Sequence, residues 1–174
     1  MKPTLYFLRS SEQKIVTDML YYAYRLDETD KKVRDFPELE TYSRFYGLSS
    51  KDLGLYALSE HKIAGGAWIR LLREDEPPIL TIGVKPEFRK MGIGSAMLEQ
   101  LFLEAGAIFE SMSVTVLNNE KSISFFKKHG FVEVENSLNK SLVDESEVIA
   151  MLKELPKARV VRPMDGYNPQ KWMD

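Results

Sequence analysis

The stretch that decides the fold is ILTIGVKPEFRKMGIGSAMLEQL, residues 79–101. Its first six residues are mostly apolar or β-branched, a composition that predicts a buried strand. Pro86 ends the strand because proline cannot donate a hydrogen bond to a sheet. Gly92 and Gly94 follow in a basic turn, and apolar residues then recur at helical spacing from Met97. We therefore expect a strand, a tight turn and a long helix.

The turn has the properties of an anion-binding site. Lys85, Arg89 and Lys90 bring positive charge, and glycine lets backbone N–H groups approach a ligand closely. The first N–H groups of a helix lack intrahelical partners and carry partial positive charge. A diphosphate fits such a place.

Three glycine-rich patterns could apply to this turn. A Walker loop needs a Gly-Lys-Ser/Thr run, which is absent, and a dinucleotide fingerprint needs a third glycine where Met97 stands. The pattern that remains is Arg-x-x-Gly-x-Gly, formed by Arg89, Gly92 and Gly94. The plainer alternative is a strand-to-helix turn with two permissive glycines and no ligand.

Composition sets the outer limits. A chain of 174 residues with 44% hydrophobic and 29% charged residues is expected to form one globular domain. The net charge of −2 gives no general attraction to nucleic acid or to an anionic membrane. The lack of cysteine excludes disulfides and thiolate catalysis, and His61 and His129 are too far apart in sequence to favour a metal site. No apolar run approaches the length of a membrane span, and the N-terminus lacks a signal-peptide pattern, so we expect a cytoplasmic protein.

Periodicity along the rest of the chain predicts the other elements. A first helix is expected to end at about residue 26, and a second is expected over residues 37–46. Strands are expected over residues 5–9, 53–59, 63–72, 112–117, 131–135 and 148–155. The strand, helix and strand of residues 79–117 form a βαβ unit, so its two strands should be parallel. We expect one domain over residues 1–155. Residues 156–174 read as a tail without periodicity, which packs on its own domain or on a partner subunit through Trp172, or stays loose.

A second informative stretch is NNEKSISFFKKHGF, residues 118–131. It contains Asn119, then a short helix with Phe126, then Gly130-Phe131. Together with the Arg-x-x-Gly-x-Gly turn, it resembles the GNAT superfamily of N-acetyltransferases, whose pattern here is Asn-x-x-Ala, a Tyr and a Gly-Phe. The resemblance implies an α/β (α+β) fold with a mixed, mostly antiparallel sheet of about seven strands and about four helices. Its fourth and fifth strands would be parallel and splayed.

The resemblance also implies acetyl-CoA as cosubstrate, with no metal. The splayed strands would accept the pantetheine arm by β-strand addition, with Gly83 as a candidate β-bulge, and the glycine turn would hold the pyrophosphate. The implied cofactor-binding residues are Ile82, Gly83, Val84, Arg89, Lys90, Met91, Gly92, Ile93, Gly94, Ser95, Asn119, Ser122 and Phe126.

The catalytic residues stay unassigned. Phe126 stands where the family has a tyrosine that protonates the departing thiolate, and phenylalanine has no proton to give. The strand of residues 79–84 carries no carboxylate, and the nearest acids read as surface charges: Glu74, Asp75, Glu76, Glu133 and Glu135.

Three functions remain open at this point. The first is an acetyl-CoA-dependent N-acetyltransferase acting by direct attack of a primary amine of a small molecule or peptide. The second is a CoA-binding sensor or regulatory module with little turnover, which Phe126 supports. The third is a nucleotide-binding domain without acyl chemistry.

The acceptor site should be shaped by the first two helices, their loop and residues 136–145, with Tyr21, Tyr22 or Tyr24 as candidates. A homodimer is compatible with the tail, and no nucleic acid or membrane is expected as a partner.

Overall fold

The protein is built on one mixed sheet. The computed structural model describes residues 2–157. Eight strands follow the order β1-β2-β3-β4-β5-β8-β6, with β7 paired to β8. Among the strands of residues 2–157, only the pair β4–β5 is parallel. The strands are β1 (Thr4–Phe7), β2 (Leu53–Ser59), β3 (Lys62–Arg70), β4 (Ile79–Val84), β5 (Ser111–Leu117), β6 (Val132–Glu133), β7 (Asn139–Lys140) and β8 (Glu147–Glu154).

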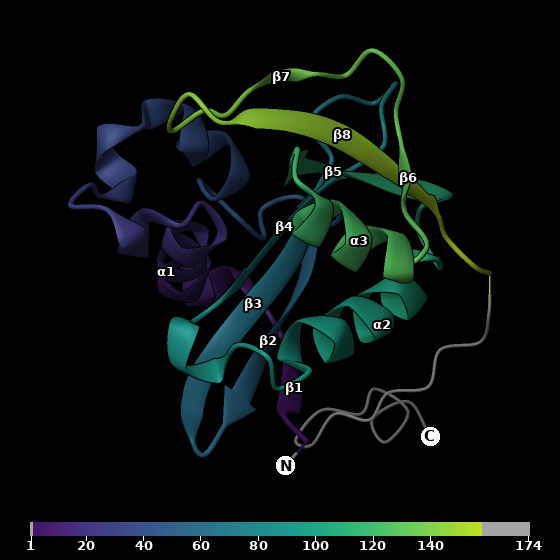
Figure 1. The fold of residues 1–174 in the computed structure, drawn as a ribbon. Coiled ribbons are helices and arrows are strands. Elements are labelled where there is room, and N and C mark those ends of the chain that lie inside the picture. The colour runs from purple at the N-terminus through teal and green to yellow at the C-terminus, as the bar shows by residue number, and fades with distance from the viewer. Residues whose placement is uncertain (1, 158–174) are drawn as a thin grey trace.

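Helices cover both faces of this sheet (Figure 1). They are α1 (Gln13–Ala23), α2 (Ile93–Ala105) and α3 (Glu120–Lys128), and the 3-10 segments are η1 (Ser10–Glu12), η2 (Leu26–Glu28), η3 (Val33–Asp35), η4 (Pro37–Tyr42) and η5 (Pro86–Phe88). One apolar core packs α2 and α3 against the sheet and includes Met97, Leu101 and Phe126. A second core packs α1 and η4 on the other face and includes Met19 and Trp68.

The central part of the chain follows its sequence pattern. The strand, turn and helix of residues 79–101 form as predicted, β5 is parallel to β4, and the mixed fold with that pair at its centre is confirmed. The helix α2 ends at Ala105, where Gly106 is the C-cap, in keeping with the low helix propensity of glycine.

The structure differs from the sequence-based expectation at several places. The predicted helix over residues 37–46 is a 3-10 segment over Pro37–Tyr42, and the first helix ends at Ala23. The strand predicted over residues 131–135 contains only Val132 and Glu133. The predicted bulge at Gly83 is wrong, because the register of β3 with β4 runs without a shift from Arg70↔Ile79 to Gly65↔Val84.

Among residues 2–157, no helix is long and apolar enough to cross a membrane. The predictions made for the tail, including an anchor at Trp172, fall almost entirely on residues 158–174 and lie outside the described part of the chain.

Candidate functional site

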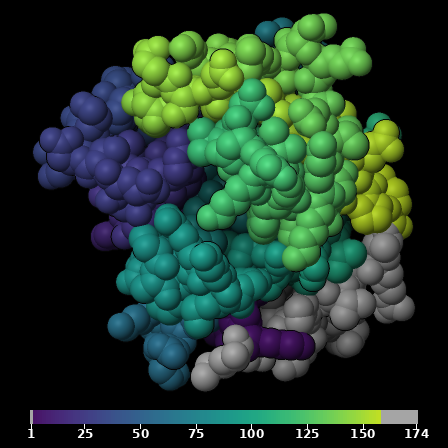
Figure 2. Space-filling model, viewed as in Figure 1, coloured from purple at the N-terminus to yellow at the C-terminus, as the bar shows by residue number. Residues whose placement is uncertain are grey.

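The site begins where β4 and β5 separate. The two strands pair only at Ile79↔Ser113 and Leu80↔Val114, and no further pairs follow along either strand. A cleft of about 1220 Å³ opens there. Figure 2 shows the hollow between the N-terminal segments, the turn before α2 and the helix α3. The cleft is therefore produced by an interrupted sheet and not by a surface loop.

The unpaired edge of β4 presents backbone groups to this cleft. The N–H of Lys85 donates to the carbonyl of Ala64 on β3 at 2.8 Å. Because backbone groups alternate in direction along a strand, those of Gly83 also face β3. The N–H and C=O groups of Ile82 and Val84 face the other way, into the gap that β5 leaves.

The turn between β4 and α2 forms one end of the cleft. Pro86–Phe88 is a 3-10 turn, and the buried Phe88 ring anchors it to the core. Lys90 and Gly92 take left-handed conformations, with φ of 63° and 80°. These two reversals bring the chain from the strand into the first turn of α2.

The N-terminus of α2 suits a phosphate group. The first intrahelical hydrogen bond runs from the Ala96 N–H to the Gly92 carbonyl at 3.0 Å, so the N–H groups of the preceding residues have no helical acceptor. A Cβ added at Gly92 would meet no atom within 4 Å, which means that the turn is open on this side. A diphosphate fits both observations.

Arg89 lies beside this turn with its side chain folded back. Its Nε donates to the Val84 carbonyl at 3.0 Å. Its guanidinium also lies 3.8 Å from the Asp27 carboxylate. The other carboxylate oxygen of Asp27 is buried without a hydrogen-bond partner among the described residues. Arg89 thus connects the glycine turn with the segment that follows α1.

The helix α3 provides the opposite wall. Asn119 caps it, since its Oδ1 accepts a hydrogen bond from the Ser122 N–H at 2.8 Å. Ser122 and Phe126 follow on the side that lines the cleft. The Phe126 ring packs edge-on against Phe125 and Phe131, with centroids 5.1 and 5.4 Å away. Phe126 is therefore an apolar part of the wall, with no hydroxyl to donate a proton.

Ser95, in the first turn of α2, has a second contact that fixes its side chain. Its Oγ lies 2.9 Å from Nε2 of His129. His129 is buried, and the Lys153 ammonium donates to its carbonyl at 2.8 Å. Burial lowers the pKa of His129, with Lys128 and Lys153 acting in the same direction and Glu99 against them. A neutral His129 thus holds Ser95 at the edge of the cleft.

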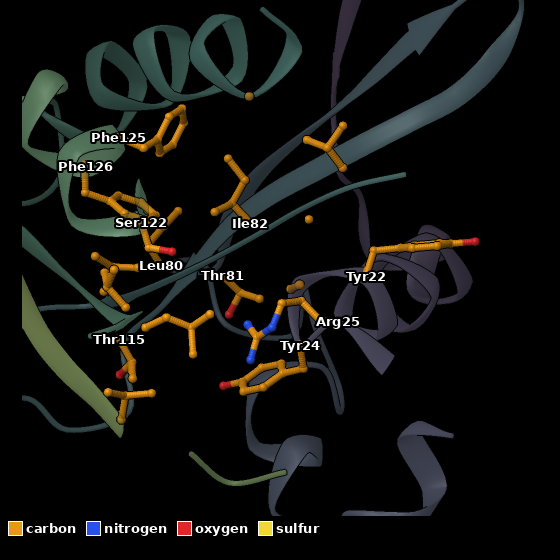
Figure 3. Close-up of a pocket in the computed structure, with 18 of the residues that line it drawn as sticks. Tyr22, Tyr24, Arg25, Leu80, Thr81, Ile82, Thr115, Ser122, Phe125 and Phe126 are labelled. Carbon is orange, nitrogen blue, oxygen red and sulfur yellow. The ribbon is translucent and has the colours of Figure 1, made fainter. Parts of the chain in front are cut away.

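The cleft continues on the face of the sheet that α1 covers. Tyr22, Tyr24, Arg25 and Thr81 line it there (Figure 3). Burial raises the pKa of the Tyr24 hydroxyl, and the nearby Tyr42 adds to the effect. Tyr24 and Tyr42 are consequently protonated at neutral pH and act as neutral hydrogen-bonding groups.

The carboxylates considered from the sequence do not lie in the cleft. Glu74 pairs with Lys51, Asp75 and Glu76 pair with Arg73, and Glu133 pairs with Lys127, all on the surface. Of the described residues that line the cleft, the only acid is Glu28, which is exposed. Among residues 2–157, no group of three or more His, Asp or Glu side chains could hold a metal ion.

The residues expected at the cofactor site come together. All of them line the cleft except Met91, which is 50% exposed beside the turn. Sequence reasoning missed Phe125, Thr81 and Arg25. Thr81 could have been found from strand alternation, which places it on the opposite face from Ile82. No sequence pattern indicated Arg25. It lies in a left-handed turn after α1, and no glycine marks that turn in the sequence.

Comparison with known proteins finds similarity over part of the chain. Residues 51–133 match the family model of the acetyltransferase (GNAT) domain. The chain is 38% identical over 60 residues to the probable N-acetyltransferase san of Drosophila melanogaster, covering 33% of each protein. It is 41% identical over 73 residues to a serine–tRNA ligase of Pyrobaculum islandicum, covering 41% of this chain and 16% of that protein. The chain thus spans only a small part of these relatives.

Solved structures show the same fold. A GNAT superfamily phosphinothricin acetyltransferase from Sinorhizobium meliloti, solved in complex with AcCoA, superposes with a TM-score of 0.68 at 20% identity over 97% of both chains. A GNAT family acetyltransferase from Streptococcus pneumoniae gives a TM-score of 0.67 at 22% identity, covering 89% of this chain and all of that one. At these identities the similarity concerns the fold.

Proposed function

We propose that this chain, which contains a domain of the GNAT acetyltransferase family, is an acetyl-CoA-dependent N-acetyltransferase. The observation that carries the proposal is the combination of two features in one cleft. The edge of β4 is free of β5 beyond Leu80, and the open N-terminal turn of α2 lies next to it. The first feature accepts an extended amide-containing chain, and the second accepts a diphosphate.

The proposed binding residues follow from these two features. The backbone groups of Ile82 and Val84 would pair with the pantetheine amides, while Gly83 lines the cleft with its own backbone groups directed to β3. The N–H groups of the turn would hold the pyrophosphate, supported by Arg89 and Lys90. Asn119 uses its Oδ1 for the cap, which leaves its amide N–H groups for a ligand, and Ser122 and Phe126 complete the wall.

The chemistry supplied by bound acetyl-CoA is an acetyl group activated as a thioester. An N–H of the free β4 edge that does not pair with a pantetheine amide is suited to donate to a carbonyl oxygen on which charge develops. Holding an amine and a thioester side by side removes much of the entropic cost of their reaction. Phe126 cannot donate a proton, but a thiol pKa near 8.5 means that a thiolate is already a fair leaving group. The proton that the attacking amine loses can then reach the thiolate through water.

The test is release of free CoA thiol from acetyl-CoA in the presence of a library of primary amines. Thiol release that depends on a particular amine supports the transferase. The second candidate is the CoA-binding sensor or regulatory module, which the apolar Phe126 favours. Tight acetyl-CoA binding without thiol release for any amine would support that candidate and contradict the transferase.

Three further points stay predictions from the sequence. They are a cytoplasmic location, the extent of the domain over residues 1–155, and assembly as a homodimer. Gel filtration with light scattering tests the last of them, and expression of residues 1–157 tests whether the domain folds without the rest of the chain.

A further inference from the structure

The two faces of β4 separate the cleft into two parts. A Cβ added at Gly94 of α2 would contact Ile82 and Val84 side chains at 3.8 and 3.9 Å, so these side chains face α2. A Cβ added at Gly83 would instead lie 2.9 Å from the backbone nitrogen of Ala23 in α1. Thr81 is two residues from Gly83 and shares its face. The part of the cleft next to Thr81 thus lies away from the glycine turn.

Arg25 is the cation of this second part. Figure 3 shows its guanidinium between the Tyr24 ring and Thr81. The backbone of Arg25 is left-handed, with φ of 56°. Two hydrogen bonds fix it, from the Arg25 N–H to the Tyr22 carbonyl and from the Glu28 N–H to the Arg25 carbonyl, both at 3.1 Å. The left-handed conformation is costly for a residue with a Cβ. Here it is maintained by these two hydrogen bonds, and it places the Arg25 side chain in the cleft.

The Arg25 side chain has no direct ionic partner among the described residues. No carboxylate of residues 2–157 lies within 4.0 Å of it, and it forms no side-chain hydrogen bond within that range. Asp27 is directed to Arg89. Burial acts to raise the pKa of Asp144, but hydrogen bonds with Ser146 and, to a smaller extent, the charge of Arg25 lower it. The Oδ1 of Asp144 accepts from the Ser146 N–H at 2.9 Å. Glu28 lines the cleft from an exposed position.

The charges of the residues that line the cleft also favour an anionic ligand beside Arg25. The lining cations are Arg25, Arg89, Lys90, Lys121, Lys128 and Lys140, against the single acid Glu28 among the described residues. Arg89 and Lys90 belong to the glycine turn, where the proposed diphosphate accounts for them. Arg25 lies on the other face, so it remains without a directly paired anion when that part is filled, and Asp144 acts on it only at longer range. A half-buried guanidinium in this position favours binding a carboxylate in its planar, two-pronged geometry.

We propose that Arg25 binds the carboxylate of the acceptor, which makes the acceptor a primary amine of the amino-acid class. The inference rests on the proposed acetyl transfer and specifies its substrate. Thr81 offers a neutral hydrogen bond beside the guanidinium, and Tyr24, whose hydroxyl is hydrogen-bonded to Tyr42, lies next to it. Polyamines and basic peptide segments are disfavoured because they would bring positive charge against Arg25.

The experiment compares each of the common amino acids with its carboxamide as acceptor, with acetyl-CoA saturating. The carboxamide keeps the amine and side chain and removes the charge. We expect kcat/KM to favour the acid by about 10- to 100-fold, the factor that a lost charge-assisted hydrogen bond gives. Arg25→Gln should remove this preference by raising KM for the acid alone, and Arg25→Lys should keep part of it. Arg34→Gln is the matched control, because Arg34 is exposed and does not line the cleft.

The outcomes separate the inference from the function on which it rests. Equal rates for acids and carboxamides, or an equal loss for both in Arg25→Gln, would overturn the carboxylate site while leaving acetyl transfer in place. If no amine releases thiol, calorimetry measures whether the same amino acids bind to the CoA-bound protein. Binding that Arg25→Gln abolishes would support the carboxylate site and contradict acetyl transfer, and absence of binding would overturn both.

Discussion

Gly92 and Gly94 show how single residues shape the proposed anion site. Gly92 has φ of 80°, where an alanine costs about 1 kcal/mol, and Gly94 has only ordinary contacts for an added Cβ, the nearest at 3.5 Å. The double variant Gly92→Ala/Gly94→Ala should therefore fold. It should lose about 10-fold or more in CoA affinity by calorimetry, because the backbone can no longer approach the diphosphate. Pantetheine, which lacks the diphosphate, serves as the control ligand, and unchanged CoA affinity would remove the turn from the site.

His129 makes the stability of the fold depend on pH. Burial lowers the pKa of His129 in the folded state below the usual 6.5. At pH values between the folded-state pKa and 6.5, the unfolded chain therefore binds more protons than the folded one. Stability is then complete above pH 6.5 and falls as the pH drops through the folded-state pKa. Denaturant unfolding between pH 7 and pH 5 should show this decrease, and His129→Asn should reduce its slope. His61→Asn is the control, since His61 is exposed in a left-handed turn that asparagine tolerates. A slope unchanged in His129→Asn would contradict the assignment.

The packing of α1 on β4 depends on a missing side chain. A Cβ at Gly83 would collide with the backbone of α1 at Met19 and Ala23, whereas a Cβ at Gly66 would meet the flexible side chain of Met19 at 3.0 Å. We expect Gly83→Ala to destabilise the protein by about 1–3 kcal/mol and Gly66→Ala by clearly less. Urea denaturation of both variants measures the difference. Equal costs would mean that α1 can move away from β4 without penalty.

A buried ion pair connects the irregular segment of residues 37–48 to the sheet. Arg70 on β3 contacts Asp52 at 3.1 Å and donates to the Thr41 and Arg44 carbonyls at 3.1 and 2.7 Å. Asp52 is 3% exposed and also accepts from the Gly47 N–H. Asp52→Ala should cost about 3–5 kcal/mol in unfolding free energy, because it leaves the Arg70 charge without its partner.

The exposed pair of Arg44 with Glu40 is the comparison for that variant. Its atoms are 3.4 Å apart and its two side chains are 64% and 58% exposed. Glu40→Ala should cost less than about 1 kcal/mol, as exposed pairs usually do. The same denaturation curves measure both changes. Similar costs for the two variants would show that the Arg70 network does not hold the segment in place.

These elements also show what the sequence could predict. The strand, turn and helix of residues 79–101 were predictable because periodicity, proline and glycine all indicate one structure. The segment of residues 37–46 was not, since its apolar residues fit a helix but Arg70 and Trp68 on β3 bind its carbonyls. The Trp68 Nε1 donates to the Tyr42 carbonyl at 2.7 Å. The turn side of the site was predictable from local motifs. The α1 side, with Arg25 and Thr81, was not, because only the tertiary fold brings these residues together.

The whole molecule consists of two parts of a sheet that meet at two residue pairs. Strands β1 to β4 form a continuous antiparallel part, and β5 with β8, β6 and β7 forms another. The first two residues of β4 pair with Ser113 and Val114 of β5, and the two strands form no other pairs. The glycine turn belongs to the first part, and the C-terminal end of β5 leads into α3. A ligand that touches β4, the turn and α3 therefore connects the two parts of the sheet that the strands leave separate.

Ligand stabilisation tests this arrangement and the competing nucleotide hypothesis together. A ligand that binds only the folded state at 100 times its Kd adds about 2.7 kcal/mol of stability, which for a chain of this size raises Tm by about 5–10 °C. We expect acetyl-CoA and CoA to produce such a rise in a thermal unfolding assay. ATP and NAD should give a smaller rise, because they lack the pantetheine arm that would pair with the free edge of β4. Protection by ATP or NAD without protection by CoA would instead favour a nucleotide-binding domain without acyl chemistry. Protection by CoA that persists in the Gly92→Ala/Gly94→Ala variant would place the diphosphate elsewhere on the molecule.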